Sequence, residues 1–255
     1  MEIKSLHNKR VLTCQKSSVI AQLEREILPL QGLKKLTTDH DINVGLSSIE
    51  NAFPNYIFPV GCVHEFLSAS PEDAASTNGF AAALLSKLML FQGAAIWIST
   101  NKNLFPVALK NFGIEPENII FVNPKNERDI LYAAEEALKC NRLTTVIAEI
   151  KNITFKESRR FQLAAEQSRV TGFLMRHQPK ILNTIACVSR WRISSLPSEL
   201  DDGMPGVGFP RWNVELLKVR NGKPGSWKIE WSSNQFHQIE EEEISIQTNE
   251  RRMAG

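Results

Sequence analysis

Two glutamates lie at positions where a protein of this size could carry catalytic or metal-binding chemistry. Glu65 falls within the apolar run of residues 60–67, and Glu149 falls near the end of the apolar run of residues 143–150. A carboxylate at the mouth of a parallel sheet can orient a metal-bound water, but it can equally cap a helix or pair with Lys or Arg. Neither glutamate belongs to a recognisable motif with a His or a nucleophile. We therefore assign no catalytic residue and expect the protein not to be an enzyme.

The segments around Glu65 predict a nucleotide-binding unit that lacks its phosphate loop. Residues 60–67 predict a buried strand, residues 79–90 a helix that is apolar nearly all round, and residues 94–99 a second buried strand. A P-loop needs Gly for close backbone contact with phosphate, a Lys for charge and a Ser or Thr for magnesium. The predicted turn, residues 68–78, has no Gly and no Lys and carries two acids. We expect no cofactor there.

Cysteine and histidine usage indicates neither a metal site nor a disulfide framework. The four Cys residues are far apart and never in C-x-x-C spacing, and the five His residues are scattered. With 255 residues, of which 42% are hydrophobic and 23% charged, the chain has the composition of a globular protein with one α/β core. It has no run of about 18 apolar residues and no secretory signal at its start. We expect a reduced, cytoplasmic protein.

Hydrophobic periodicity predicts that the α/β pattern continues to residue 231. Further helices are predicted at residues 103–112, 126–140 and 155–176, and further strands at 118–122, 143–150, 181–188, 213–219 and 227–231. In the last strand, Trp227, Ile229 and Trp231 alternate with polar residues, which is typical of a strand with one buried face. The fold class is therefore α/β, a mainly parallel sheet flanked by helices and ending in an antiparallel hairpin.

Charge is unevenly distributed along the chain although the net charge is only +2. Residues 151–231 hold fourteen Lys and Arg against seven Asp and Glu, a balance of +7, whereas the C-terminal stretch contains the run Glu240–Glu243. A basic segment of this kind indicates a surface for a polyanion or an acidic protein. The alternative is that these charges only solvate helix and strand faces.

Several motifs together resemble one protein family. Residues 42–49 and 58–66 resemble the lead-in to the first core strand of RecA-type recombinases. The segments 112–119, 160–166, 190–193, 210–220 and 222–227 are similar to the ImuA family, and the last two, with Arg-Trp and Gly-x-Pro-Gly-x-Trp, are the most specific. The resemblance covers residues 42–231 and implies a RecA-like core there with a degenerate P-loop. Outside it, an apolar stripe predicts an N-terminal helical extension over residues 1–41, and the loss of apolar periodicity after Trp231 predicts an acidic, disordered tail over residues 232–255.

The same resemblance implies a function and its partners. ImuA proteins are RecA-like accessory factors of bacterial error-prone repair, and they act in a damage-induced mutasome. The implied partners are an ImuB-like relative of Y-family polymerases and an error-prone C-family polymerase. Two alternatives stay open: a RecA-like nucleotide-dependent DNA-binding ATPase, and a cell-division inhibitor similar to SulA.

Candidate contact residues follow from the recombinase comparison, in which loops after the fourth and fifth core strands touch DNA. The first loop shrinks here to residues 151–154, whereas the second, residues 190–211, keeps its length. Its candidates for DNA or partner contact are Arg190, Trp191, Arg192, Arg211 and Trp212. Arg can bind phosphates and Trp can stack on bases. In the alternative, both Trp side chains lie in the core and the Arg residues pair with Glu, which leaves at most weak DNA binding.

An apolar stripe near the N-terminus is the second candidate interface. Residues 13–28 predict a helix, and its stripe consists of Val19, Ile20, Leu23 and Ile27. In recombinases the N-terminal helix packs on the neighbouring protomer, so the stripe is a candidate for self-association or for docking RecA. It could equally fold back onto the core of the same chain.

Overall fold

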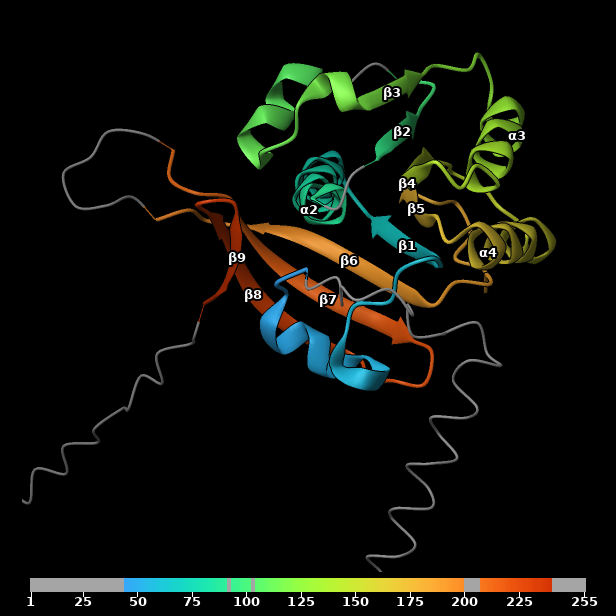
Figure 1. Cartoon of the computed structure of the whole chain (residues 1–255). Coiled ribbons are helices and arrows are strands. Elements are labelled where there is room, and N and C mark those ends of the chain that lie inside the picture. The colour runs from blue at the N-terminus through green and yellow to red at the C-terminus, as the bar shows by residue number, and fades with distance from the viewer. Residues whose placement is uncertain (1–43, 91–92, 102–103, 200–206, 240–255) are drawn as a thin grey trace, which may run out of the picture.

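One nine-stranded sheet organises the part of the chain that the computed structural model describes, residues 44–90, 93–101, 104–199 and 207–239 (Figure 1). The strands are β1 (Val63–Ser68), β2 (Ala94–Ile98), β3 (Ile119–Val122), β4 (Leu143–Glu149), β5 (Thr171–His177), β6 (Ser189–Leu196), β7 (Arg211–Val219), β8 (Gly225–Ser232) and β9 (Gln235–Gln238). Their order is β3-β2-β4-β5-β1-β6-β7-β8-β9. Neighbours from β3 to β6 are parallel, and those from β6 to β9 are antiparallel. The predicted α/β fold with a mainly parallel sheet is therefore confirmed.

Helices cover both faces of the parallel part of the sheet. The α-helices are α2 (Pro71–Met89), α3 (Glu127–Leu138) and α4 (Phe155–Ser168), and the 3-10 helices are η1 (Ser47–Ala52), η2 (Pro54–Tyr56), η3 (Pro106–Phe112) and η4 (Pro116–Asn118). In Figure 1, α2 lies on one face and both α3 and α4 lie on the other. Because both faces are covered, the central strands carry nearly continuous apolar residues instead of an alternating pattern. No helix in the described ranges is long and apolar enough to cross a membrane.

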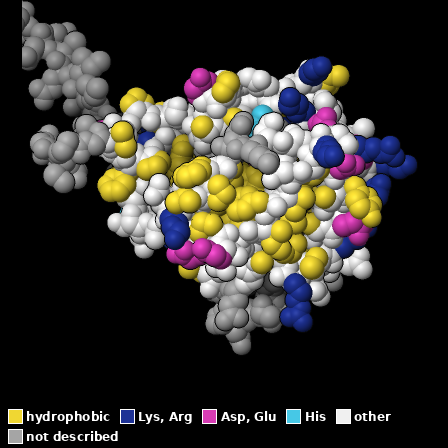
Figure 2. All heavy atoms as spheres, turned by 90° about the horizontal axis from the view of Figure 1, so that it is seen from above, with side chains coloured by type: hydrophobic (Ala, Val, Ile, Leu, Met, Phe, Trp, Pro, Cys, Tyr) yellow, Lys and Arg dark blue, Asp and Glu magenta, His cyan; other side chains and the backbone are white. Residues whose placement is uncertain are grey.

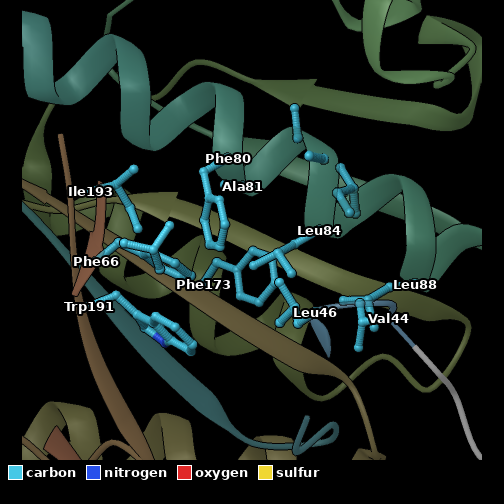
Figure 3. Packing of buried hydrophobic residues seen from close by; sticks show 14 of the residues in the cluster. Val44, Leu46, Phe66, Phe80, Ala81, Leu84, Leu88, Phe173, Trp191 and Ile193 are labelled. Atoms are coloured by element: carbon cyan, nitrogen blue, oxygen red, sulfur yellow. The ribbon is translucent and has the colours of Figure 1, made fainter. Parts of the chain in front are cut away.

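The larger hydrophobic cluster lies between α2 and the strands β1, β5 and β6 (Figure 3). Phe80 of α2 packs beside Trp191 of β6, with ring centroids 6.2 Å apart. Trp191 in turn stacks with Phe66 of β1, whose ring also meets the edge of Phe173 of β5. Each of these side chains is fully buried, which stabilises the fold by about 2 to 3 kcal/mol per residue. Adjacent strands are thus joined through their side chains as well as their backbones.

Two predicted elements are wrong around β5. The helix predicted for residues 155–176 ends at Ser168, because Arg169 adopts a left-handed conformation with φ 69° and closes α4. The chain then forms β5, which lies between β4 and β1 at the centre of the sheet. Residues 181–188, predicted as a strand, form no strand, and β6 begins only at Ser189.

Three further boundaries differ from the sequence predictions. Most of the predicted turn at residues 68–78 is helical, because α2 starts at Pro71. The helix predicted at residues 103–112 is the 3-10 helix η3, which ends as predicted at Gly113, in a left-handed conformation with φ 76°. The sheet continues beyond residue 231 into β9, where Phe236 is buried, so the proposed tail begins too early. The predicted N-terminal helix and the run Glu240–Glu243 lie outside the described residues.

Candidate functional site

The connection between β1 and α2 is a short capped turn. Only Ala69 and Ser70 separate the strand from the helix, and the Ser70 hydroxyl accepts a hydrogen bond from the backbone N–H of Asp73 at 3.1 Å. Pro71 occupies the first helical position and has no N–H to donate. Glu72 and Asp73 add negative charge in the first turn. The helix start is therefore occupied by its own cap and carries acids where a phosphate would need positive charge.

Glu149 lies at the carboxyl end of β4 and is held by side chains from neighbouring strands. Its Oε1 accepts a hydrogen bond from the Trp97 indole at 2.9 Å, and its Oε2 accepts one from the Ser99 hydroxyl at 2.7 Å. His177, at the end of β5, places Nε2 at 3.9 Å from Oε2. Burial lowers the pKa of His177, although the charge of Glu149 opposes this shift. The carboxylate is thus fixed in position, with no Lys or Arg among its recorded partners.

No metal site is formed by the side chains that the structure places. Within the described ranges, no three His, Cys, Asp or Glu residues come together in a way that could hold a metal ion. Glu149 and His177 form only a pair, and Ser99 is the third neighbour. At 3.9 Å the His177 ring nitrogen is beyond hydrogen-bonding distance of the Glu149 carboxylate.

Glu65 has two partners that sequence analysis did not find. Its Oε1 lies 2.7 Å from Nη1 of Arg176, and its Oε2 binds Nε of Arg190. Glu65 and Arg176 are buried, and Arg190 is mostly buried with 14% of its side chain exposed. Arg176 also donates to the carbonyl oxygen of Ile181, and Arg190 donates to that of Asn183. The network therefore ties β1, β5 and β6 to the segment after β5. The sequence signal that could have indicated this network is the presence of charged residues, Glu65 and Arg176, within otherwise apolar segments.

A buried Ser–His pair nearby is structural. The His64 Nδ1 lies 2.6 Å from the Ser189 hydroxyl, and its Nε2 lies 2.8 Å from the carbonyl oxygen of Pro59. The Ser189 oxygen also accepts from the Trp191 indole at 2.6 Å, so the group forms a closed chain. Burial lowers the pKa of His64 to about 4 and raises the pKa of the adjacent Cys62 thiol. Both shifts keep the groups neutral, and full burial keeps substrates away from them.

The predicted contact residues are not one cluster. Arg190, Trp191 and Arg192 lie in β6, whereas Arg211 and Trp212 start β7. In the antiparallel register, Arg190 pairs with Lys218 and Arg211 pairs with Leu196. Arg190 therefore lies six residues along β6 from Leu196, the partner of Arg211, or roughly 20 Å. The loop predicted to span residues 190–211 is shorter, because β6 runs to Leu196.

Base stacking by the two Trp residues is wrong for the folded protein. Trp191 is 0% exposed and Trp212 is 3% exposed, and both belong to the cluster under α2. Stacking on a base requires a free ring face, which neither residue offers. The alternative placement in the core is the one that the structure shows.

The three Arg candidates pair with carboxylates. Arg211 binds Glu230 and Glu199, and these contacts raise its pKa above the usual value. Arg192 lies 3.5 Å from Glu215 and is 45% exposed. Arg190 is committed to Glu65, so reversing its charge would place two acids together in the interior and disturb the fold. Arg192 is therefore the better surface probe. The other candidate interface, Val19, Ile20, Leu23 and Ile27, lies outside the described residues.

Comparison with curated proteins identifies the family. The chain is 30% identical over 203 residues to Protein ImuA in each of two strains of Caulobacter vibrioides, a match that covers 74% of this chain and 82% of the relative. The chain belongs to the ImuA family. The sequence resemblance is thereby confirmed. A search against protein-family models found no match.

A second relative resembles this ImuA-family chain over a shorter length. The cell division inhibitor SulA of Photorhabdus laumondii subsp. laumondii is 30% identical over 95 residues, which is 37% of this chain and 54% of that protein. The similarity spans just over half of the SulA chain. It leaves the ImuA assignment unchanged, because the ImuA match extends over twice as many residues.

Proposed function

We propose that the protein is a non-catalytic accessory protein of bacterial DNA damage tolerance. In this proposal it acts in error-prone translesion synthesis, through contacts with an ImuB-like polymerase hub, an error-prone C-family polymerase and RecA. Membership of the ImuA family supports the process, and the strand order with its antiparallel extension supports a RecA-like core that has lost its P-loop. A cytoplasmic location remains part of the same proposal.

The start of α2 is the single observation that carries the non-catalytic part of the proposal. A P-loop enzyme wraps phosphate with backbone N–H groups and adds a Lys. Here the connection has two residues, its cap is satisfied by Ser70, and its first turn carries Glu72 and Asp73. Glu149 is hydrogen-bonded to Trp97 and Ser99, which favours a structural role for this acid.

Exposed apolar surface supports a role in protein contacts. Strand β3 forms one edge of the sheet and exposes 51% of Ile120, and Phe105 and Val107 beside η3 are 67% and 55% exposed. Figure 2 views the molecule from above Figure 1, the side on which β3 and η3 lie, and shows hydrophobic side chains gathered across this face. Contiguous apolar surface of this kind is typical of interaction sites. An unpaired edge strand additionally offers backbone donors and acceptors to a partner.

Direct DNA binding is a minor part of the proposal. The Arg candidates are engaged by Glu65, Glu215, Glu199 and Glu230, and the Trp candidates are buried. The remaining surface cations support only weak binding that falls as salt rises.

A pull-down with purified partners tests the proposal. The tagged full-length chain is mixed with the ImuB-like protein and the C-family polymerase encoded in the same genome, singly and together. We expect capture of the ImuB-like hub without nucleotide, and of the polymerase when the hub is present. Failure to retain either protein, with the chain folded by circular dichroism, would refute the adaptor role.

The SulA similarity supports a second candidate function, inhibition of cell division. Controlled expression of the chain in dividing cells, followed by measurement of cell length, separates the two. Filamentation without any effect on damage-induced mutation would favour the division inhibitor. Normal cell length would exclude the function as a division inhibitor.

A further inference from the structure

A pocket of about 620 Å³ opens at the carboxyl end of β4 and β5, between α3 and α4. The first turn of α3 contributes Glu127 and Arg128, the start of α4 contributes residues 152–154, and the segment after β5 contributes Ile181 and Asn183. Its volume is within the range of sites that enclose a small ligand or several side chains. None of the sequence predictions pointed to it.

Among the described residues, two cations line this pocket, of which Arg176 is committed to Glu65 and Arg128 is exposed. Lys151 and Lys180 adjoin the lining residues Asn152 and Ile181 in the sequence. Arg128, Lys151 and Lys180 are exposed and form no ion pair with any residue in the described ranges. By contrast, Glu127 accepts a hydrogen bond from the backbone N–H of Asn152 at 2.7 Å. Glu157 accepts one from the backbone N–H of Thr154 at 2.8 Å, as part of a capping box.

The local sequence reinforces this imbalance. Residues 151–183 contain seven Lys and Arg and two Asp and Glu, a difference of +5. The acids of α3 are largely occupied, since Asp129 binds the helix cap Asn126 and Glu135 pairs with Arg160 and Lys139. The pocket is therefore complementary to a negatively charged ligand.

Aliphatic side chains at the rim specify the kind of ligand. Ile181 in the lining is 72% exposed, and its sequence neighbour Leu182 is 55% exposed. No aromatic side chain belongs to the lining in the described part of the chain; Phe155, directly after the lining residue Thr154, is the nearest in sequence. Leu131 and the buried Ile153 continue this apolar surface into the wall. Branched aliphatic groups pack against peptide side chains, whereas single-stranded nucleic acid prefers aromatic platforms. The combination favours an acidic peptide with apolar anchors.

We propose that this pocket binds a short acidic peptide segment of a partner protein, with a Leu, Ile or Phe side chain seated between Ile181 and Leu131. The inference deepens the adaptor role and rests on it for the partner's identity, but peptide binding is measured on this chain alone.

Phage display of random peptides against the full-length chain, followed by fluorescence anisotropy with the enriched peptides, tests this site. We expect enrichment of peptides that combine Asp or Glu with Leu, Ile or Phe. Arg128→Glu and Ile181→Asp should each weaken binding about tenfold or more, because they remove the charge and the apolar contact respectively. Arg142→Glu is the matched control: Arg142 is an exposed cation just before β4, at the opposite end of that strand, and its reversal should leave affinity unchanged.

Three results would overturn the peptide site. The first is no enrichment, or enrichment of peptides without acids. The second is equal affinity of the Arg128→Glu variant and the parent chain. The third is that oligothymidylate displaces the peptide and that oligothymidylate itself no longer binds the Arg128→Glu and Ile181→Asp variants. This result would assign the pocket to single-stranded DNA. None of these results would bear on capture of the ImuB-like hub by the full-length chain, so the two proposals fail separately.

Discussion

Glu65 of β1 and Arg176 of β5 form a buried ion pair across two neighbouring strands, with 2.7 Å between Oε1 and Nη1. Arg190 of β6 binds the second carboxylate oxygen, so one glutamate pairs with two guanidinium groups. Charges removed from water in this way stabilise the fold only while every member has its partner. The carboxylate therefore aligns three adjacent strands of the sheet.

Replacing Glu65 should expose this dependence. We expect Glu65→Gln to lower the free energy of unfolding by about 3 kcal/mol or more, because it leaves two guanidinium groups without a counter-charge. Urea unfolding followed by circular dichroism measures the change. Glu215→Gln is the control: it removes a partly exposed pair with Arg192 and should cost about 1 kcal/mol or less. Equal costs for the two variants would contradict the importance of the buried network.

His64 should make stability depend on pH. Its pKa is lowered from 6.5 to about 4 by burial, so between these values the unfolded chain binds a proton that the folded chain does not. The contribution of His64 to the free energy of unfolding is therefore fully present above pH 6.5. It decreases by about 3 kcal/mol in total as the pH drops toward 4. Urea unfolding at a series of pH values should therefore show that the free energy of unfolding decreases less on acidification for His64→Gln than for the parent chain.

His237 provides the control for that experiment because it is an exposed residue of β9. We expect His237→Gln to retain the pH dependence of the parent chain. Burial also lowers the pKa of His177, which contributes loss of stability in the same direction on acidification. An unchanged slope in the His64→Gln variant would show that His64 is not held neutral.

The apolar face at β3 should contribute to partner binding. Phe105→Asp combined with Ile120→Asp should weaken capture of the ImuB-like hub about tenfold or more, since both side chains are at least half exposed and would be buried by a partner. Biolayer interferometry measures the affinity. Tyr56→Asp, at an aromatic residue that is 72% exposed on η2, serves as the control. If the double variant binds the ImuB-like hub with the affinity of the parent chain, the hub does not contact this face.

The capped start of α2 predicts that the chain does not bind ATP tightly. We expect no measurable heat of binding in calorimetry with ATP and magnesium, because Glu72 and Asp73 repel phosphate and no Lys is available in this turn. Tight binding that is abolished by Glu149→Ala would instead support the RecA-like ATPase.

The fold was predictable from sequence where apolar runs were short and bounded by turn residues. The strands near residues 94–99, 118–122 and 143–150 were located to within a residue or two at each end. Strand β5 was missed because its apolar run follows α4 after only two residues, and the helix ends at Arg169 without a Gly or Pro. Residues 181–188 carry strand-like composition, yet only residues 185–188 are buried, and only Val188 forms backbone hydrogen bonds with Val63 of β1 and with Arg220 after β7.

The candidate site was less predictable, because its contacts join residues distant in sequence. Arg190 meets Glu65 across 125 positions, and a motif search that looks for neighbouring catalytic residues finds neither partner. The pocket beside Arg128 is similarly assembled from three separate segments. Burial of Trp191 and Trp212 in the core was one of two alternatives left open by the sequence, the other being base stacking from a loop. Charge composition did indicate that residues 151–231 are basic, but not that part of this segment lines a pocket.

Damage-induced mutation in a strain lacking this gene tests the central claim, a non-catalytic role in damage tolerance, most directly. The strain is complemented with the parent chain or with Glu149→Gln, and mutation frequency is measured after ultraviolet irradiation. We expect both chains to restore induced mutation equally, because Gln keeps a hydrogen-bonding side chain beside Trp97 and Ser99 and no nucleotide chemistry is needed. Failure of the parent chain to restore mutation would contradict the role in damage tolerance. Restoration by the parent but not by a stably expressed Glu149→Gln chain would contradict the absence of catalysis.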